Sequence, residues 1–391
     1  MFVKADILHK GPKGWELYEV KSSTEVKEIY IDDTALQYYV ISGTGLKVSK
    51  ASVVFIDNEY IRNGEIEVGK LFKIQDITDE VKKRQKLVKQ EISRLKKMLQ
   101  EEMPDIDIGP HCKDPNVCDF KGHCWQHIPE YSVFKLGGKG LDKFDAYNRG
   151  IVLIEDLDVR GLNRQQKIQA EAYLTKTEYI DRGNVKKFLD SLWYPICFFD
   201  FETVDSAIPV FNGTKPYQKI PFQYSAHLLK SKGGKLKHSE YLAHPGKDFL
   251  KELLLKLLED IPQDSCVIAF NSPFEKQVLN NLAGWFPKYK GQISKIVNNL
   301  RDLAKPFRSR SVYRHEMNGS YSLKAVLPAL VPEMTYNDLA VRNGGMAMDA
   351  FAVMAGLKDK SEIKQLRKDL LEYCSLDTLA MVKILEKLRK I

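Results

Sequence analysis

The chain has 391 residues, of which 43% are hydrophobic and 29% charged, a composition typical of globular proteins and a length that favours two or three domains. No apolar run approaches the roughly 20 residues of a membrane-spanning helix. The first residues, MFVKADILHK, carry charges where a signal peptide would be apolar, so we expect a cytoplasmic protein with no membrane partner. The net charge of +8 permits a polyanionic partner without requiring one. Six cysteines in this length argue against a disulfide scaffold and favour reduced thiols or metal ligands.

The N-terminal residues predict a hairpin with strands at 2–8 and 15–23, joined by a glycine-containing turn. Antiparallel pairing would bring Asp6 near Glu19 and Lys21, and the latter two share a face because they are two residues apart. Two acids and a lysine at a strand end can hold a metal and stabilise charge developing on a phosphate. The alternative is a plain hairpin with an exposed Glu/Lys pair.

Residues 29–46 predict a helix that is capped at its start by Asp32 or Asp33 and ended by a glycine. A strand at 51–58 follows, and then a charge-rich amphipathic helix within 76–103, whose lysines we expect on a solvated face.

The order of Asp6, the Glu19-x-Lys21 pair and a helix carrying Gln37 resembles the RecB-like nucleases of the PD-(D/E)XK group, over about the first 130 residues. The resemblance implies an α/β nuclease core. It also implies that Asp6 and Glu19 are metal-binding catalytic residues, that Lys21 is catalytic and that Gln37 contacts substrate.

Cys112, Cys118 and Cys124 recur with five residues between neighbours in a loop rich in Pro, Gly and Asp, which favours a metal or cluster site. The spacing differs from the paired CxxC motifs of zinc sites. It is similar to the C-terminal part of the iron-sulfur staple in a subset of RecB-like nucleases, including those that trim CRISPR spacers, and implies a [4Fe-4S] cluster. We find no fourth cysteine ligand in this chain, and His111 or His123 is an alternative.

The helix and strand that open the RecB-like fold, with their acidic or histidine motif, do not precede Asp6 in this sequence. Either Met1 is an internal residue of a longer protein, or the N-terminal nuclease is degenerate. We therefore expect a nuclease core that is incomplete at its start.

Residues 129–192 predict a helical connector with helices at 144–157 and 164–174 and no evident chemistry. Its basic residues are expected to be solvated surface, with nucleic-acid contacts as the alternative; they are Arg160, Arg164 and Lys167.

The sequence ICFFDFETVD begins at Ile196 as an apolar run typical of a buried strand and ends with Asp200 and Glu202 on one face. Carboxylates so close repel each other in a partly dry environment, which favours a bound divalent metal. A strand end with two solvated acids is the alternative.

Further elements follow in an α/β order: strands at 222–229, 238–245 and 266–270, and a helix at 247–258. The strand-to-helix junction after 266–270 places Asn271 at a helix start and Glu275 one turn in.

Residues 370–385 predict a helix on which Tyr373 and Asp377, four residues apart, lie on the same side. The order Asp-x-Glu, Asn-x-x-Phe-acid, Tyr-x-x-x-Asp resembles the DnaQ-like DEDD exonucleases of the subgroup with tyrosine. The stretches PFQYSAHLL, GSYSLKAVLPALVP and EYCSLDTLAMV closely resemble a bacterial family that joins a RecB-like part to a C-terminal domain of unknown function. One departure is Glu275, where the second motif usually has Asp.

This resemblance implies two Mg²⁺ or Mn²⁺ ions about 4 Å apart. Asp200 would bridge them, Glu202 and Asp377 would complete the two coordination spheres, and Glu275 would bind directly or through water. Tyr373 would orient the attacking water rather than remove its proton.

Asn271 is a candidate substrate-binding residue, and Lys324 is a candidate phosphate contact with a surface lysine as the equal alternative. The cysteines next to the acidic motifs are expected to be core residues rather than ligands; they are Cys197, Cys266 and Cys374. Asp302 is left out of the site.

The expected architecture is a RecB-like core with its cysteine cluster at 1–128, a connector at 129–192 and an RNase H-like (DnaQ-like) mixed sheet flanked by helices at 193–391. The expected function is a 3′-5′ exonuclease acting on DNA or RNA that is single-stranded or has a free 3′ end. One alternative is a non-catalytic nucleic-acid-binding protein built from degenerate nuclease domains. Another, an enzyme acting on a small molecule, has no phosphate loop or nucleophile elbow to support it.

Overall fold

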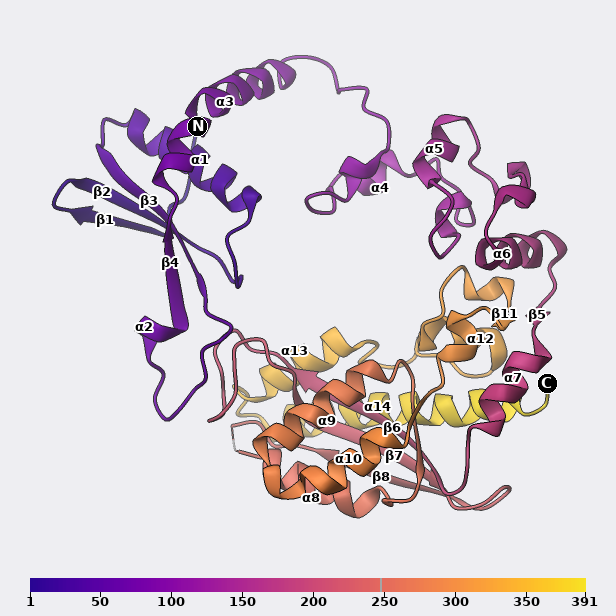
Figure 1. Ribbon diagram of the computed structural model, residues 1–391. Coiled ribbons are helices and arrows are strands. Elements are labelled where there is room, and N and C mark those ends of the chain that lie inside the picture. Colours follow the sequence, from indigo (N-terminus) through magenta and orange to yellow (C-terminus); the bar gives the residue numbers. More distant parts are fainter. Residues whose placement is uncertain (247) are drawn as a thin grey trace. The chain divides into compact units, whose positions relative to one another are not determined.

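The computed structural model describes residues 1–246 and 248–391 (Figure 1). The chain divides into two compact units. The N-terminal unit comprises Met1–Trp125 and Asp205–Gln218, and the C-terminal unit comprises Gln126–Val204 and Lys219–Ile391. Both combine sheets with helices, which confirms the α/β class.

The N-terminal unit has one four-stranded sheet in the order β1-β2-β3-β4, in which only the β2-β3 pair is parallel. The parallel pair requires a crossover, and α1 provides it. The elements are β1 (Ile7–Gly11), β2 (Gly14–Val20), α1 (Glu28–Gly43), β3 (Val48–Ile56), α2 (Val68–Leu71), β4 (Phe72–Asp76), α3 (Thr78–Met98), the 3-10 turn η1 (Pro110–Cys112) and α4 (Lys121–Cys124).

The predicted hairpin is confirmed, although its first strand runs from Ile7 to Gly11 and not over 2–8. Its turn is tight at Gly14, whose φ of +144° and close approach to the Lys47 carbonyl leave no room for a side chain. The predicted cap of α1 is wrong, because the helix begins at Glu28 and both aspartates lie inside it. Their carboxylates form ion pairs instead, Asp32 with Arg84 at 2.7 Å and Asp33 with Lys21 at 2.7 Å.

The C-terminal unit is built on a five-stranded sheet in the order β10-β9-β6-β7-β8. A second, two-stranded sheet pairs β11 with β5. The strands are β5 (Tyr179–Ile180), β6 (Ile196–Val204), β7 (Ile220–Leu229), β8 (Leu236–Leu242), β9 (Cys266–Ala269), β10 (Leu300–Asp302) and β11 (Val312–Tyr313).

The C-terminal unit also contains helices and short 3-10 turns. The helices are α5 (Lys143–Asn148), α6 (Arg164–Thr175), α7 (Arg182–Asp190), α8 (Leu250–Asp260), α9 (Pro273–Trp285), α10 (Lys290–Asn298), α11 (Lys305–Arg308), α12 (Leu323–Leu330), α13 (Gly344–Met354) and α14 (Lys360–Leu388). The 3-10 turns are η2 (Val133–Lys135), η3 (Ile154–Asp156), η4 (Val159–Gly161), η5 (Pro287–Tyr289) and η6 (His315–Met317).

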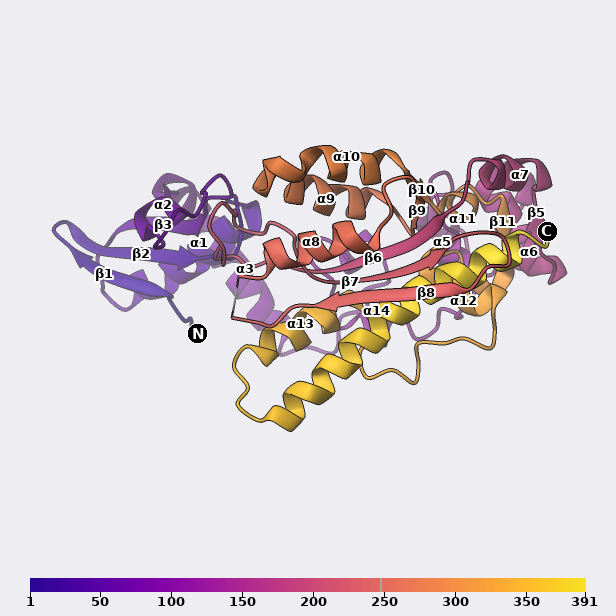
Figure 2. The same ribbon diagram turned by 90° about the horizontal axis from the view of Figure 1, so that it is seen from below.

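The central strand β6 runs antiparallel to β7 and parallel to β9. Its side chains alternate between two covered faces. Cys197, Phe199 and Phe201 pack in a core with α8, α9 and α10. The opposite face, which carries Asp200 and Glu202, is covered by α13 and α14 (Figure 2).

Two predicted helix boundaries are wrong. The helix expected at 144–157 ends at Asn148, because Gly150 adopts a φ of +79° that breaks the helix. The helix expected at 247–258 begins at Leu250, while Lys247 itself lies outside the described residues. The helix expected at 164–174 is confirmed as α6.

None of the helices in the described part of the chain combines the length and the apolar character needed to cross a membrane.

Candidate metal-binding active site

Strand β6 places Asp200 and Glu202 side by side on the face that α14 covers. Glu202 is buried and Asp200 is half-buried. The thiol of Cys374 on α14 lies 4.0 Å from Asp200 Oδ2. One ligand atom from each of these three residues lies within 4.8 Å of the other two, a spacing that suits a common metal ion.

Helix α14 adds Tyr373 and Asp377, both buried and one turn apart, as the helical spacing predicts. The hydroxyl of Tyr336, from the segment between α12 and α13, donates a hydrogen bond of 2.5 Å to Asp377 Oδ1. This bond holds the carboxylate in place and satisfies one of its oxygens.

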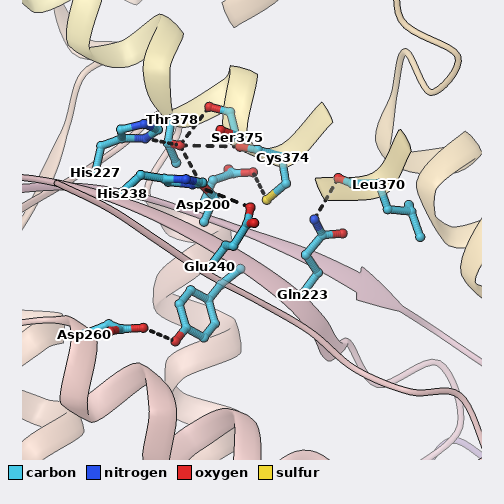
Figure 3. Close-up of polar contacts among 12 residues, drawn as sticks. Asp200, Gln223, His227, His238, Glu240, Asp260, Leu370, Cys374, Ser375 and Thr378 are labelled. Atoms are coloured by element: carbon cyan, nitrogen blue, oxygen red, sulfur yellow. Dashed lines mark hydrogen bonds and ion pairs between the residues drawn. The ribbon is translucent and has the colours of Figure 1, made fainter. Parts of the chain in front are cut away.

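A layer of hydrogen bonds between β7 and α14 sets the height of these residues above the sheet (Figure 3). Gln223 Nε2 donates to the Leu370 carbonyl at 2.7 Å, and the hydroxyls of Ser225 and Thr378 lie 2.7 Å apart. Gln223 and Ser225 are the cross-strand partners of Glu202 and Asp200. The same strand pairs that position the acids therefore also anchor the helix above them.

Glu275 reaches the site from the first turn of α9, as expected from the strand-to-helix junction. Its side chain is buried, and its Oε2 has no hydrogen-bond partner among the described residues. A buried carboxylate oxygen without a donor is costly unless a cation or a proton neutralises it.

The four carboxyls are protonated more readily than isolated ones. Burial, followed by repulsion from Asp377, Glu202 and Glu275, raises the pKa of Asp200 well above its ordinary value. Burial raises the pKa of Glu202 to about 8, with Asp377 adding to the effect.

Burial also raises the pKa of Glu275 to about 8. For Asp377, burial raises the pKa to about 6 although the hydrogen bond from Tyr336 opposes the rise. Such mutual repulsion is the condition that a bound cation removes.

Lys324 is the positive charge that faces these acids, because its ammonium lowers the pKa of Asp200, Glu202 and Asp377 against the dominant effect of burial. The ammonium lies over the rings of Tyr336 and Tyr373, at 5.5 Å and 5.4 Å from their centroids, and donates to the Arg342 carbonyl.

A cavity of about 590 Å³ opens onto four of the site residues, Asp200, Lys324, Tyr373 and Asp377. Its wall comes from β6, the β9-α9 junction, the η6-α12 segment, α14 and a loop near residue 137; the lining residues are Gly137, Gly138, Asp200, Phe270, Asn271, Arg310, Gly319, Ser320, Tyr321, Ser322, Leu323, Lys324, Tyr373 and Asp377. Asn271 precedes α9 rather than opening it, has a left-handed φ of +69° and is exposed. Its backbone is held by an N–H to Asp302 Oδ1 bond of 2.9 Å.

The N-terminal unit forms a separate polar cluster. Glu19 is buried, with Oε1 2.6 Å from Lys21 Nζ and Oε2 accepting from Gln37 Nε2 at 2.7 Å. Asp33 binds the same lysine. Although burial alone would lower the pKa of Lys21, hydrogen bonds to Asp33 and Glu19 raise it.

Asp6 is exposed and accepts a hydrogen bond of 2.8 Å from the backbone N–H of Val20. The hairpin thus places Asp6 beside the end of β2, as expected. Both oxygens of Glu19 are already occupied by Lys21 and Gln37, so this cluster is a closed ion-pair network.

Cys112 is buried, and Cys118 and Cys124 are half-buried in the loop around η1 and α4. The Cys118 N–H donates to the Cys112 carbonyl at 3.0 Å, which folds this loop back on itself. The described residues of the N-terminal unit supply three thiols, one fewer than a cluster with four cysteine ligands needs.

Two residues of these clusters were missed by the sequence reasoning. Tyr336 lies in a loop without periodic pattern, and Asp33 was considered only as a cap. Cys374 is fully buried, as expected of a core residue, although its thiol also lies near Asp200.

Comparison with known proteins finds a family model that matches part of the C-terminal unit, and three relatives. A family model described as Domain of unknown function (DUF2779) matches residues 197–322. The matched segment contains Asp200, Glu202 and Glu275 and ends before Tyr373 and Asp377. It agrees with the expected resemblance to a bacterial family that has a domain of unknown function.

The chain is also similar to three uncharacterized proteins. These are MG366 of Mycoplasma genitalium (29% identical over 206 residues, 48% of this chain and 31% of the relative), its homolog in Mycoplasma pneumoniae (26% over 290 residues, 64% and 43%) and UU173 of Ureaplasma parvum serovar 3 (24% over 289 residues, 65% and 40%). The aligned part of the chain spans less than half the length of each relative.

Proposed function

We propose that this chain is a metal-dependent nuclease that removes nucleotides from the 3′ end of DNA or RNA. The clustering of four buried carboxyls beside one cavity carries this proposal: Asp200 and Asp377, which line the cavity, and Glu202 and Glu275 behind them. Three of their pKa values are raised by neighbouring acids as well as by burial. Without a cation, acidic groups placed this close repel one another and destabilise the fold. Carboxyls with pKa values perturbed in this way cluster at functional sites.

The topology of the C-terminal unit supports the DnaQ-like assignment. Strands β6, β7 and β8 form an antiparallel meander, and β9 and β10 add parallel strands on the other side of β6. An RNase H-like sheet has this order, with the first acidic motif on the strand that β6 represents. The acid-bearing helices α9 and α14 then follow in the order that the sequence motifs require.

The donor set fits Mg²⁺ or Mn²⁺, because hard cations bind carboxylate oxygens and the unpartnered Glu275 Oε2 offers a further ligand atom. Asp200, Glu202 and Asp377 would bind the cations, and Glu275 would bind directly or through water. Bound there, the cations would supply a more acidic water and stabilise negative charge on the leaving oxygen.

The remaining residues bind and orient. Burial and the nearby Asp377 raise the pKa of Tyr373 far above its ordinary value, so its hydroxyl stays protonated and donates a hydrogen bond rather than acting as a base. Lys324 and Asn271 line the cavity and would contact phosphate and sugar. Tyr336 fixes Asp377.

For the N-terminal unit we propose a RecB-like fold that binds the nucleic-acid strand. The network around Glu19, in which both carboxylate oxygens already accept from Lys21 and Gln37, favours this binding role over cleavage. This observation also supports the second candidate, a protein in which neither unit cuts nucleic acid.

Cleavage of 5′-labelled single-stranded DNA and RNA in Mn²⁺ separates the two candidates. A ladder that shortens from the 3′ end with wild-type protein, and is lost in Asp200→Asn, supports the exonuclease. Binding of both polymers without any cleavage supports the non-catalytic protein. Internal cuts that persist in Asp200→Asn would instead assign activity to the cluster of Asp6, Glu19 and Lys21.

A further inference from the structure

The cavity is lined by a second basic residue, which the proposed chemistry does not use. Arg310, which follows α11, is only 3% exposed and lines the same cavity as Asp200 and Asp377. Its backbone has a left-handed φ of +57°, a conformation that is unfavourable for an arginine.

Neutral groups surround the Arg310 guanidinium. It donates to three carbonyls, those of Gly319 at 2.5 Å, Ser320 at 3.3 Å and Phe307 at 3.4 Å. Its Nε has no hydrogen-bond partner, and among the described residues it forms no ion pair with a carboxylate.

Buried arginines are normally paired, because a desolvated charge without a counter-ion is expensive. Burial accordingly lowers the pKa of Arg310, and the only opposing contributions come from tyrosines. The three carbonyls leave N–H groups of the fork unused, and these suit a bidentate anion such as phosphate.

The wall beside Arg310 is suited to a nucleotide. Tyr321 is 40% exposed, and the guanidinium carbons of Arg308 and Arg310 lie 6.0 Å and 5.8 Å from the centre of its ring. An exposed aromatic ring next to cations is the feature on which unpaired bases stack in proteins that bind single strands.

Glycine backbone forms the facing wall and permits close approach. A Cβ at Gly137 would lie 2.6 Å from the Gly319 carbonyl and 2.8 Å from Arg310 Nη2, so this position admits no side chain. Gln169 on α6 holds the loop through two bonds, accepting from the Gly137 N–H at 2.8 Å and donating to its carbonyl at 3.1 Å. The segment that the sequence predicted as a connector without chemistry therefore builds part of this cavity.

We propose that Arg310 binds a non-scissile phosphate of a single nucleic-acid strand whose base stacks on Tyr321. This inference rests on the proposed function and identifies its substrate class. A cavity of about 590 Å³ is in the range of small-ligand sites, and thus accommodates one or two nucleotides of a single strand rather than a duplex. The phosphate is either the internal one next to the cleaved bond or a phosphate on the 3′ terminus.

The test measures the affinity of the full-length chain for fluorescein-labelled ten-nucleotide oligothymidine as a function of salt, in an Asp200→Asn background that prevents hydrolysis. One arm uses a 3′-hydroxyl end and the other a 3′-phosphate end. Arg310→Gln is expected to weaken binding by about tenfold or more. It is also expected to reduce the slope of log K against log salt by about 0.7, the value for one lost phosphate contact on a single strand.

Three controls separate binding from folding. Arg310→Lys should keep the salt slope, because it keeps the charge. Tyr321→Ala should weaken binding while Tyr321→Phe should not, and neither exposed-ring variant should alter thermal unfolding. Arg314→Gln removes a nearby arginine that is already paired with Glu178 at 2.7 Å, and should leave the slope unchanged.

An unchanged slope in folded Arg310→Gln, or a Tyr321→Ala variant that binds as well as its parent, would overturn the subsite. If Arg310→Gln reduces the salt slope with both oligonucleotides, Arg310 binds the internal phosphate. If it reduces the slope only with the 3′-phosphate oligonucleotide, Arg310 binds the terminal phosphate. The proposed function can fail separately from the subsite. It fails if Arg310→Gln weakens binding as expected while wild-type protein cleaves neither DNA nor RNA.

Discussion

The Tyr336 hydroxyl lies 2.5 Å from Asp377 Oδ1, and this bond joins a loop ahead of α13 to the last acid of the site on α14. Tyr373, on the same helix as Asp377, is also buried and lines the same cavity as Asp200. We propose that the two tyrosines, which share Asp377 as a neighbour, differ in role: Tyr336 positions an acid, and Tyr373 contacts the substrate.

Exchange of each tyrosine for phenylalanine should separate these roles. Tyr336→Phe leaves a buried carboxylate oxygen without its donor and is expected to lower the free energy of unfolding by about 1–3 kcal/mol. Tyr373→Phe is expected to lower kcat roughly 10- to 100-fold, the worth of one hydrogen bond to a charged group. Urea unfolding and steady-state cleavage measure both variants. Equal effects of the two changes on kcat and on stability would contradict the division.

Removal of the Glu275 charge should stabilise the metal-free protein at high pH. The pKa of this carboxyl is raised from 4.5 to about 8, so the folded state holds the proton more tightly than the unfolded state. Its contribution is therefore favourable below pH 4.5 and is lost as the pH rises through 8, at a cost of at most about 5 kcal/mol.

In EDTA at pH 9, Glu275→Gln is thus expected to unfold at a higher temperature than wild type, and near pH 4.5 at a similar one. Mn²⁺ should then stabilise wild type more than the variant. The exposed Glu259 provides the matched control, Glu259→Gln. A Glu275→Gln variant that is less stable than wild type at pH 9 in EDTA would show that the carboxylate has a partner that neutralises it.

The buried histidine His227 predicts a second pH effect, which has the same cause, burial, and the opposite direction. His227 is 5% exposed and bonded through Nδ1 to Thr378 Oγ1 at 2.8 Å, and burial, followed by repulsion from the stacked His238, lowers its pKa from 6.5 to about 4. Stability that this neutral imidazole confers is complete above pH 6.5 and is lost as the pH falls toward 4, by up to about 3 kcal/mol.

The stability advantage of wild type over His227→Gln should accordingly shrink between pH 7.5 and pH 4.5 in urea unfolding experiments. The same comparison with His244→Gln, a change at an exposed histidine, should show no such trend. A constant difference between wild type and His227→Gln across this range would mean that His227 is as readily protonated in the folded chain as in the unfolded one.

The cluster in the N-terminal unit should be separable from the exonuclease. Glu19→Gln removes the charge that binds Lys21 and is expected to lower stability by about 1–3 kcal/mol while the 3′ ladder remains. Glu25→Gln, at an exposed position, is the control. Loss of the ladder in a folded Glu19→Gln protein would transfer the catalytic role to this unit.

Sequence periodicity correctly predicted which residues share a face within one strand or helix. The alternation in β6 places Asp200 and Glu202 on one face, and the helical repeat does the same for Tyr373 and Asp377. It could not predict which loops meet these faces, because tertiary packing decides this. Tyr336 is such a loop residue, 41 positions from Asp377.

Two further failures have the same physical origin. Asp33 was expected to cap α1, yet the nearby Lys21 offers its carboxylate a stronger partner than a backbone N–H. Arg310 gave no signal, since a lone arginine in sequence is normally a solvated residue, and only the structure reveals that it is buried without an acid.

The most direct test of the central claim is the rate of 3′-end cleavage of a labelled single strand against the concentration of free Mn²⁺, for wild type and Asp200→Asn side by side. The acid cluster predicts no cleavage in EDTA, saturable cleavage of wild type as Mn²⁺ is added, and a rate at least about 1,000-fold lower in Asp200→Asn, as expected when several kcal/mol of charge stabilisation are removed. Cleavage that continues in EDTA, or that is undiminished in Asp200→Asn, would contradict the account.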